Sequence, residues 1–294
     1  METRRTMRLA AVSLVAAAVV AGCGGGNKEE PTIPQSGVRV TTTTASTTTT
    51  TTGSTTTTAS GSAAAPLKIV VTNDDGYAAA GIDKLVSALS AMDGVDVTVV
   101  APAEQRSGTG GKTTSGALAT SKKKLASGHD ATAVAGFPAD TIRVAFDDMK
   151  LDPDLVISGI NEGQNLGPVI DVSGTVGAAR AAVRRGVPAL AVSQGLGQKV
   201  DYDAAARLVV RWVTDNRAKI ADGSLPTTYV LNLNVPSCAS GEVRGEMAVA
   251  SATAGNALAA ADCTSTGTGF KDDVTAFAGG YATLTQIPVE PKAA

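Results

Sequence analysis

The chain has 294 residues, of which 43% are hydrophobic, and its formal net charge at pH 7 is -2. This charge balance provides no basic face for a nucleic-acid polymer, and an aromatic content of 3% leaves few rings on which bases could stack. His129 is the single histidine. A multi-histidine zinc site and a Ser-His-Asp triad are therefore poor interpretations of the chemistry.

The first 22 residues have the pattern of a secretory signal. Arginines precede an apolar run, Leu9–Val20, that is too short to span a bilayer as a mature helix. The sequence Val20-Ala21-Gly22-Cys23 is similar to a bacterial lipobox, which implies cleavage before Cys23 and attachment of diacylglyceryl to its sulfur. An ordinary signal peptide with an incidental cysteine is the alternative. We expect residues 1–22 to be a lipoprotein signal peptide and Cys23 to anchor an extracytoplasmic bacterial protein to the cell membrane.

Residues 23–65 are rich in Gly, Thr and Ser and include a threonine tract from Thr41 to Thr58. They contain too few apolar residues to bury a core, so we expect a disordered tether, and such threonine-rich stalks can carry O-linked sugars. Residues 66–294 have the size of one ordinary domain. Within them, Cys238 and Cys263 could form a disulfide in an exported protein, and two free thiols are the alternative.

The folded part alternates between two apolar patterns. Short runs of β-branched residues indicate buried strands, and apolar residues at helical spacing indicate amphipathic helices. After the strand that contains Ile69–Val71, the expected elements are helix Gly81–Met92, strand Val95–Ala101, strand Ala131–Ala135, helix Ala139–Met149, strand Leu155–Ser158, helix Val176–Arg185, strand Ala189–Ser193, helix Asp203–Asn216 and strand Tyr229–Val235.

This alternation predicts an α/β protein with a Rossmann-like, three-layer αβα fold and a mostly parallel sheet. Beyond residue 235 the pattern weakens. Residues 241–273 are small and polar, and Ala282–Ile287 alternates like a half-exposed strand. We therefore expect a small, β-rich C-terminal extension.

Polar residues follow several of the expected strands, at Asp74-Asp75-Gly76, Ser107, Asn161 and Asn165. In open α/β sheets, ligands bind outside the carboxyl ends of the strands. Two adjacent carboxylates repel each other unless a cation holds them, and hydroxyl and amide oxygens complete the kind of set that Mg²⁺, Mn²⁺ or Ca²⁺ prefers. An isolated Asp-Asp-Gly is more often a simple turn, so the convergence of several loops carries the metal-site hypothesis.

Ser173-Gly174-Thr175 precedes a helix of small residues. Its hydroxyls and the free backbone N–H groups of the helix start could bind a phosphate, and simple N-capping is the alternative. A metal beside an anion site favours phosphoryl transfer to water, with metal-activated water as the attacking group. Asp74 acting as nucleophile or base is the variant left open.

The order of the sequence blocks resembles that of the SurE family, from Leu67 to Val235, with a weaker echo at residues 280–285. The blocks that carry the resemblance are Val71–Gly76, Val99–Pro102, Arg106–Gly108, Gly136–Asp140, Pro153–Asn161, Asn165–Gly167, Ser173–Gly177 and Pro188–Ser193. The resemblance implies a Rossmann-like, metal-dependent 5′(3′)-nucleotidase or phosphomonoesterase that is usually dimeric or tetrameric.

The resemblance also implies roles for individual residues. One divalent metal per subunit, Mg²⁺ or Mn²⁺, would be held by the four oxygen donors Asp74, Asp75, Ser107 and Asn161, of which Asp74 and Asp75 would be catalytic. The substrate phosphate would bind at Gly76, Asn165, Ser173, Gly174 and Thr175.

We thus expect an acid-phosphatase-like phosphomonoesterase that acts on nucleoside monophosphates or other small phosphomonoesters and forms a homodimer. The alternative is a non-catalytic lipoprotein that binds a phosphorylated ligand or a cation on the same fold. Two departures from the family pattern bear on specificity. Glu162 stands where the family has Ala and adds negative charge near the metal, and residues 236–273 are less like the family.

Overall fold

The computed structural model describes residues 65–197 and 200–291. The predicted signal peptide, Cys23 and all but the last residue of the predicted tether lie outside the described residues. Within the described part, no helix is both long enough and apolar enough to cross a membrane.

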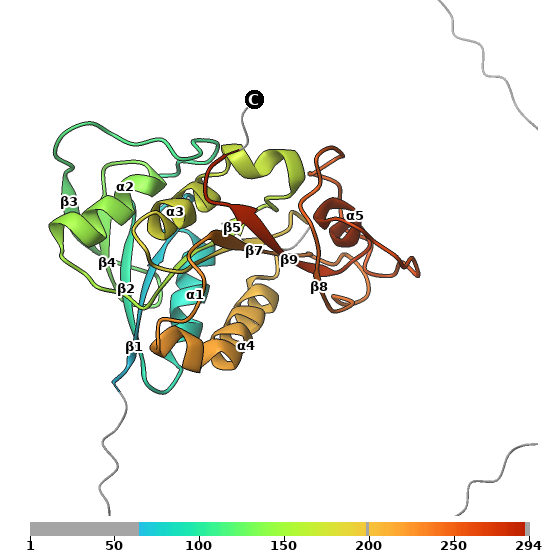
Figure 1. Ribbon diagram of the computed structural model, residues 1–294, viewed down its shortest axis with the longest axis horizontal. Coiled ribbons are helices and arrows are strands. Elements are labelled where there is room, and N and C mark those ends of the chain that lie inside the picture. The colour runs from blue at the N-terminus through green and yellow to red at the C-terminus, as the bar shows by residue number, and fades with distance from the viewer. Residues whose placement is uncertain (1–64, 198–199, 292–294) are drawn as a thin grey trace, which may run out of the picture. The chain divides into compact units, whose positions relative to one another are not determined.

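One mixed sheet of nine strands runs through the domain in the order β3-β4-β2-β1-β5-β6-β7-β9-β8 (Figure 1). The pairs β3–β4 and β7–β9 are antiparallel and the other six are parallel, which confirms the predicted, mostly parallel α/β sheet. The strands are β1 (Leu67–Thr72), β2 (Val95–Pro102), β3 (Thr120–Lys124), β4 (Asp130–Val134), β5 (Leu155–Glu162), β6 (Ala189–Gln194), β7 (Tyr229–Val235), β8 (Glu246–Ala248) and β9 (Ala282–Pro288).

Helices cover both faces of this sheet (Figure 1). The two helices on one face are α1 (Ala80–Ser90) and α4 (Tyr202–Ala221), and those on the other are α2 (Pro138–Arg143) and α3 (Gly174–Val183). Each face of the sheet has its own hydrophobic cluster. Side chains of a strand point alternately to its two faces, so β1 contributes to both clusters. Ile69 and Val71 pack in the cluster that includes α1 and α4, whereas Val70 packs with α2 and α3.

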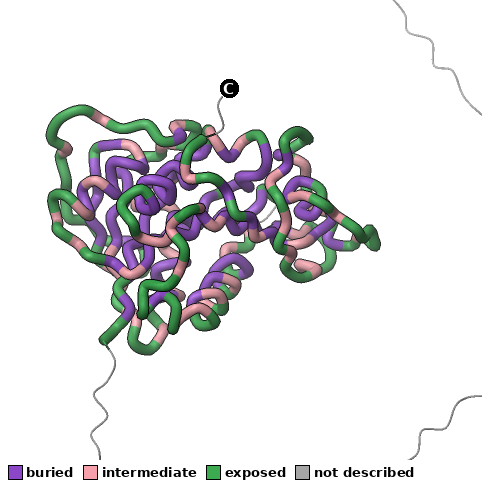
Figure 2. Tube along the Cα trace, viewed as in Figure 1, coloured by how far each residue is buried: buried purple, intermediate pink, exposed green. Residues whose placement is uncertain are grey.

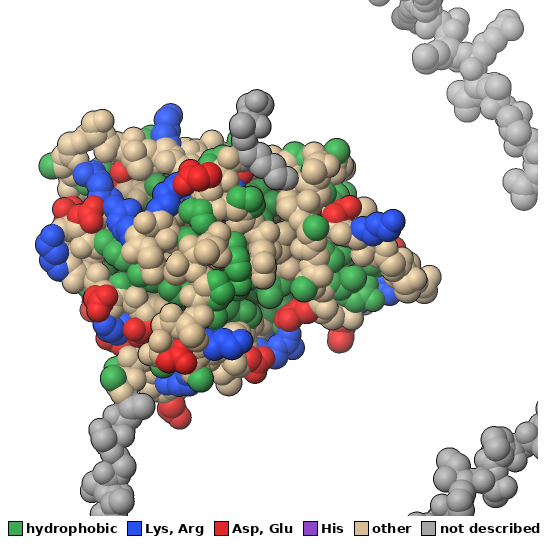
Figure 3. All heavy atoms as spheres, in the orientation of Figure 1, with side chains coloured by type: hydrophobic (Ala, Val, Ile, Leu, Met, Phe, Trp, Pro, Cys, Tyr) green, Lys and Arg blue, Asp and Glu red, His purple; other side chains and the backbone are tan. Residues whose placement is uncertain are grey.

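The distribution of buried residues matches these layers. The sheet and the helix faces turned toward it are buried, while the outer loops are exposed (Figure 2). On the face shown in Figure 3, apolar side chains gather in the middle, and basic and acidic side chains are interspersed around the edge. That face therefore presents no continuous patch of one charge sign.

Several elements differ from the sequence-based expectation, and α4 continues past its expected end at Asn216 to Ala221. Strand β5 continues to Glu162, four residues beyond the predicted end, with a register shift between Ser158 and Asn161. Gly159 permits this course because its φ of 146° lies in a region that other residues rarely adopt. The predicted helix at residues 139–149 consists of α2 followed by a π-helical turn, η1 (Val144–Asp148). Strand β3 has no counterpart in the expectation because all of its residues are exposed.

The C-terminal residues extend the main sheet. Strand β9 pairs antiparallel with β7, and β8 pairs with the outer edge of β9. Between them lie a largely irregular segment and the short helix α5 (Asp273–Ala278), whose Val274 and Phe277 pack against Leu166 in a third, small core. A disulfide between Cys238 and Cys263 closes this segment and decides between the two alternatives left open for the pair.

Replacing both Cys238 and Cys263 with Ser is expected to lower the free energy of unfolding by about 3.5 kcal/mol, the chain-entropy value for a loop of this length. The loop spans a sequence separation of 25 residues. Urea unfolding of the oxidised protein, with and without dithiothreitol, measures the effect. In the double variant dithiothreitol should change nothing, and an equal effect of the reductant on both proteins would contradict the assignment.

Candidate active site at the carboxyl edge of the sheet

Asp74 lies just beyond β1, against the start of α3. Its side chain is buried, with 2% of the residue exposed, and Thr175 Oγ1 donates a 2.6 Å hydrogen bond to its Oδ1. Burial raises the pKa of Asp74, and hydrogen bonds from the Thr175 hydroxyl and from backbone N–H groups, including those of Thr175 and Gly174, oppose that rise. The start of α3, which the sequence predicted to bind an anion, thus already faces one carboxylate of the chain.

Glycines allow α3 to begin this close to Asp74. A Cβ atom added to Gly174 would lie 2.8 Å from Asp74 Cβ and 2.9 Å from its Oδ2. One turn later, a Cβ on Gly177 would lie 2.0 Å from the backbone oxygen of Gly110, which belongs to the loop after β2. The same loop is joined to the turn that precedes α3 by the Gly110 N–H, which donates to the Val172 carbonyl. The glycines of this helix therefore set how closely the loops after β1 and β2 approach it.

Ser173 is the N-cap of α3, and its Oγ accepts a hydrogen bond from the Val176 N–H at 3.2 Å. The N-capping alternative thus describes Ser173 in this structure, and its phosphate-binding role stays a prediction. Gly76 has a φ of 95°, and a Cβ there would lie 3.0 Å from the backbone of Glu104. Glycine at this position lets the loops after β1 and β2 meet.

Asp75 and Ser107 line one cleft of about 450 Å³, together with Glu162, Tyr202 and other residues. Asp75 Oδ2 accepts a 3.0 Å hydrogen bond from the Glu162 N–H. Burial, then the charge of Asp74, and also that of Glu162, raise the pKa of Asp75 to about 6. The structure thus brings Asp75, which follows β1, and Ser107, which follows β2, to one cleft.

Asn161 and Asn165 lie at the same edge, and both are buried. The Asn161 amide nitrogen donates to the Gly163 carbonyl at 2.5 Å, which leaves its oxygen as the atom suited to a cation. Asn165 is held more tightly. Its Nδ2 donates to Ser193 Oγ at 2.9 Å and its backbone N–H donates to Asn234 Oδ1 at 2.7 Å. These contacts anchor the loop after β5 on β6 and β7, and a contact of Asn165 with phosphate stays a prediction.

Sequence reasoning did not single out Tyr202, the first residue of α4. Its hydroxyl donates to Glu162 Oε2 at 3.2 Å. Burial and the nearby charge of Glu162 raise the pKa of Tyr202, so the phenol is a neutral donor. The sequence signal that could have identified Tyr202 is its position after β6, because the loops that follow parallel strands lie at one edge of the sheet.

The donor set fits a hard divalent cation. In the described residues, neither Asp74 nor Asp75 forms an ion pair with a Lys or Arg side chain. Two adjacent carboxylates, one buried and one half-buried, are unfavourable without a cationic partner, and a divalent ion would relieve this. No cluster of three His, Cys, Asp or Glu side chains that could hold a metal occurs in the described part of the chain. A metal here would therefore depend on the hydroxyl of Ser107 and the amide of Asn161.

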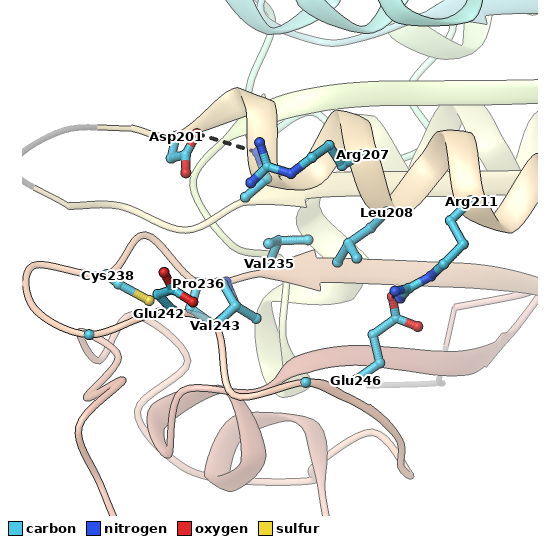
Figure 4. Close-up of a pocket in the computed structure, with 13 residues that line it drawn as sticks. Asp201, Arg207, Leu208, Arg211, Val235, Pro236, Cys238, Glu242, Val243 and Glu246 are labelled. Carbon is cyan, nitrogen blue, oxygen red and sulfur yellow. Dashed lines mark hydrogen bonds and ion pairs between the residues drawn. The ribbon is translucent and has the colours of Figure 1, made fainter. Parts of the chain in front are cut away.

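Another cavity, of about 480 Å³, lies between α4 and the segment after β7 (Figure 4). Leu208 and Val235 contribute apolar side chains, and an ion pair joins Arg211 to Glu246 at one end. None of the predicted site residues lines it. The cleft with Asp75 is therefore kept as the candidate site.

The unpaired carboxylates lead to a prediction for the metal-free protein. The pKa of Asp75 is raised from 3.8 to about 6, so the folded state binds this proton more tightly than the unfolded state does. Stability should therefore fall as pH rises from about 4 through 6. Asp75→Asn should raise the Tm at pH 8 in EDTA by about 2–4 °C, or about 1 kcal/mol, which is less than the full linkage value because solvent screens this partly exposed carboxylate. Calorimetric scans at pH 5 and pH 8 test this, and a Tm gain at pH 5 equal to that at pH 8 would contradict it.

The fold and this edge define a class of protein, a doubly wound α/β domain with a polar ligand site where its parallel strands end. Residues 69–264 match the family model described as "Survival protein SurE". The chain therefore belongs to the SurE family.

Named relatives and a solved structure agree with this. The chain is 42% identical over 185 residues to a protein of Synechococcus sp. (strain CC9902), covering 62% of this chain and 66% of the relative. It is 37% identical over 185 residues to a protein of Brevibacillus brevis, covering 61% and 70%. Both relatives are called "5'-nucleotidase SurE". The structure of the SurE protein from Aquifex aeolicus matches with a TM-score of 0.62 and 26% identity, covering 76% of this chain and 94% of that chain.

The match is partial along the relatives. In the first two Synechococcus relatives it spans 66% and 64% of their length, which is just under two thirds.

Proposed function

We propose that the protein is a divalent-metal-dependent phosphomonoesterase that hydrolyses nucleoside 5′-monophosphates. The observation that carries this proposal is the meeting of Asp74 and Asp75, which lack a cationic partner among the described residues, with the start of α3 at one sheet edge. The names of the relatives, 5'-nucleotidase SurE, support the same activity.

One set of side chains would bind the cation, and another would bind the phosphate. Asp74, Asp75, Ser107 and Asn161 would hold the cation. When bound, a divalent cation polarises phosphoryl oxygens and lowers the pKa of water.

The remaining groups would handle the phosphate. Thr175 keeps Asp74 oriented through the hydrogen bond from its hydroxyl. The hydroxyl proton of Ser173 and the amide of Asn165 would orient the phosphate beside the start of α3, where the Gly174 and Thr175 N–H groups hold Asp74. Gly76 brings the loops after β1 and β2 close enough to serve one substrate.

Hydrolysis of p-nitrophenyl phosphate by the purified protein separates this proposal from the binding-protein alternative. Turnover should require Mg²⁺ or Mn²⁺, stop on addition of EDTA, and return when excess metal is restored. Calorimetric binding of inorganic phosphate without turnover, at any metal concentration, would favour the non-catalytic binding lipoprotein and overturn the enzyme.

We also propose that the mature protein is exported and anchored through diacylglyceryl on Cys23, on the strength of the lipobox-like sequence alone. Growth with an alkyne-bearing fatty acid should label the wild-type protein, and Cys23→Ser should abolish labelling completely. In detergent phase partitioning, the wild-type protein should enter the detergent phase and the Cys23→Ser protein should enter the aqueous phase. Equal labelling of both proteins would contradict the anchor.

A further inference from the structure

Glu162 occupies a distinctive place beside the proposed metal site. It ends β5 and lines the cleft with Asp75 and Ser107. Its backbone N–H donates to Asp75 Oδ2 at 3.0 Å. The Glu162 side chain is exposed, so it extends from the predicted metal ligand into the open part of the cleft. A substrate group that enters this cleft beside Asp75 therefore meets the Glu162 carboxylate.

Tyr202 fixes one oxygen of that carboxylate. Its hydroxyl donates to Glu162 Oε2 at 3.2 Å. The ring packs, partly buried, against the core cluster that includes α1 and α4, and this packing orients its hydroxyl. Among the described residues no group donates a hydrogen bond to Glu162 Oε1. The cleft therefore presents one oriented carboxylate with an open acceptor oxygen and a phenol oxygen next to it.

The charge of Glu162 restricts what can bind there. A second phosphate or a carboxylate on the substrate would be repelled, and an alkyl group would leave the acceptor without a partner. A group with two adjacent hydroxyls offers the donors that the carboxylate lacks. Acidic side chains recognise ribose hydroxyls in this way in dinucleotide-binding folds.

We infer that Glu162, oriented by Tyr202, binds the 2′- and 3′-hydroxyls of the substrate ribose and makes the site selective for ribonucleoside monophosphates. This inference rests on the proposed phosphomonoesterase function and adds the part of the substrate that is recognised beyond the phosphate. Glu162 is a specificity-determining residue in this account, and Tyr202 is the residue that positions it.

The test compares kcat/KM for AMP, for 2′,3′-dideoxy-AMP and for p-nitrophenyl phosphate, which has no sugar. Wild type should prefer AMP to the dideoxy substrate. Glu162→Ala should reduce that preference by about tenfold, as expected for hydrogen bonds to a charged group, and any loss of p-nitrophenyl phosphate turnover should match the loss of dideoxy-AMP turnover. Tyr202→Phe should reduce the preference less. Glu242→Gln, which removes an exposed carboxylate outside this cleft, is the matched control and should change none of the three values.

The possible outcomes separate the two levels of the proposal. An unchanged AMP preference in Glu162→Ala, or no preference in wild type, overturns the ribose inference and leaves the phosphomonoesterase intact. A higher Mn²⁺ requirement in Glu162→Ala with an unchanged preference assigns Glu162 to cation binding and also overturns it. Absence of p-nitrophenyl phosphate turnover by wild type contradicts the proposed function. In that case the same preference, measured as calorimetric affinity for AMP against dideoxy-AMP, decides the inference.

Discussion

Replacing Asp74 with Asn is expected to lower kcat/KM for a phosphomonoester by about 10³-fold or more, the scale associated with losing a group that stabilises charge at a reacting phosphate. The substitution removes the negative charge from the cation site and keeps the shape of the side chain. An Asn oxygen can still accept the hydrogen bond that Thr175 Oγ1 gives to Asp74 Oδ1. Steady-state hydrolysis of p-nitrophenyl phosphate at saturating Mn²⁺ measures the loss.

Two controls make this result interpretable. Asp96→Asn applies the same chemical change to an exposed residue of β2 and should leave activity unchanged. Circular dichroism should show that Asp74→Asn remains folded. Activity within about tenfold of wild type in folded Asp74→Asn protein would contradict the role of Asp74.

Replacing Gly177 with Ala is expected to disturb both stability and activity. Alanine normally favours a helix over glycine by about 1 kcal/mol. Here its Cβ would lie 2.0 Å from the Gly110 carbonyl oxygen, a backbone atom that cannot move without its loop. Overpacking of this kind costs about 1–3 kcal/mol, so the collision should outweigh the helix preference. Because the displaced loop also carries Ser107, kcat/KM should fall by about 10²-fold for a shift of about 1 Å.

Gly111→Ala is the matched control for this prediction. It changes the neighbouring residue of the same loop, but a Cβ there meets no atom within 4 Å. Urea unfolding and phosphatase assays of both variants should separate them clearly. Equal behaviour of Gly177→Ala and Gly111→Ala would show that the contact between the loop and α3 does not set the site.

The alternation of strands and helices could be predicted because each buried element carries its own apolar pattern. Ile69, Val70 and Val71 show why, since a strand covered on both faces by helices is apolar at every position. Strand β3 lacked this signal because it is an exposed edge strand whose Lys122–Lys124 run gives no apolar face. The extension of β5 was hidden by Gly159 and by polar residues that usually mark a loop.

The site could be anticipated in outline and not in its contacts. Asp75 and Ser107 could be placed at one edge because both follow parallel strands. The anchoring of Asn165 by Ser193 and Asn234 depends on partners 28 and 69 residues away, which local pattern does not reveal. The capping role of Ser173 uses its oxygen as an acceptor and leaves the hydroxyl proton to donate, and only geometry shows that this oxygen accepts from the helix.

The central claim is that the edge around Asp74 and Asp75 binds a divalent cation and a nucleotide phosphate together. Its most direct test is the release of inorganic phosphate from AMP by the purified full-length protein as Mn²⁺ is titrated from zero. The account predicts no release in EDTA and a rate that rises to saturation with Mn²⁺. Release that is unaffected by EDTA, or none at saturating Mn²⁺, would contradict it.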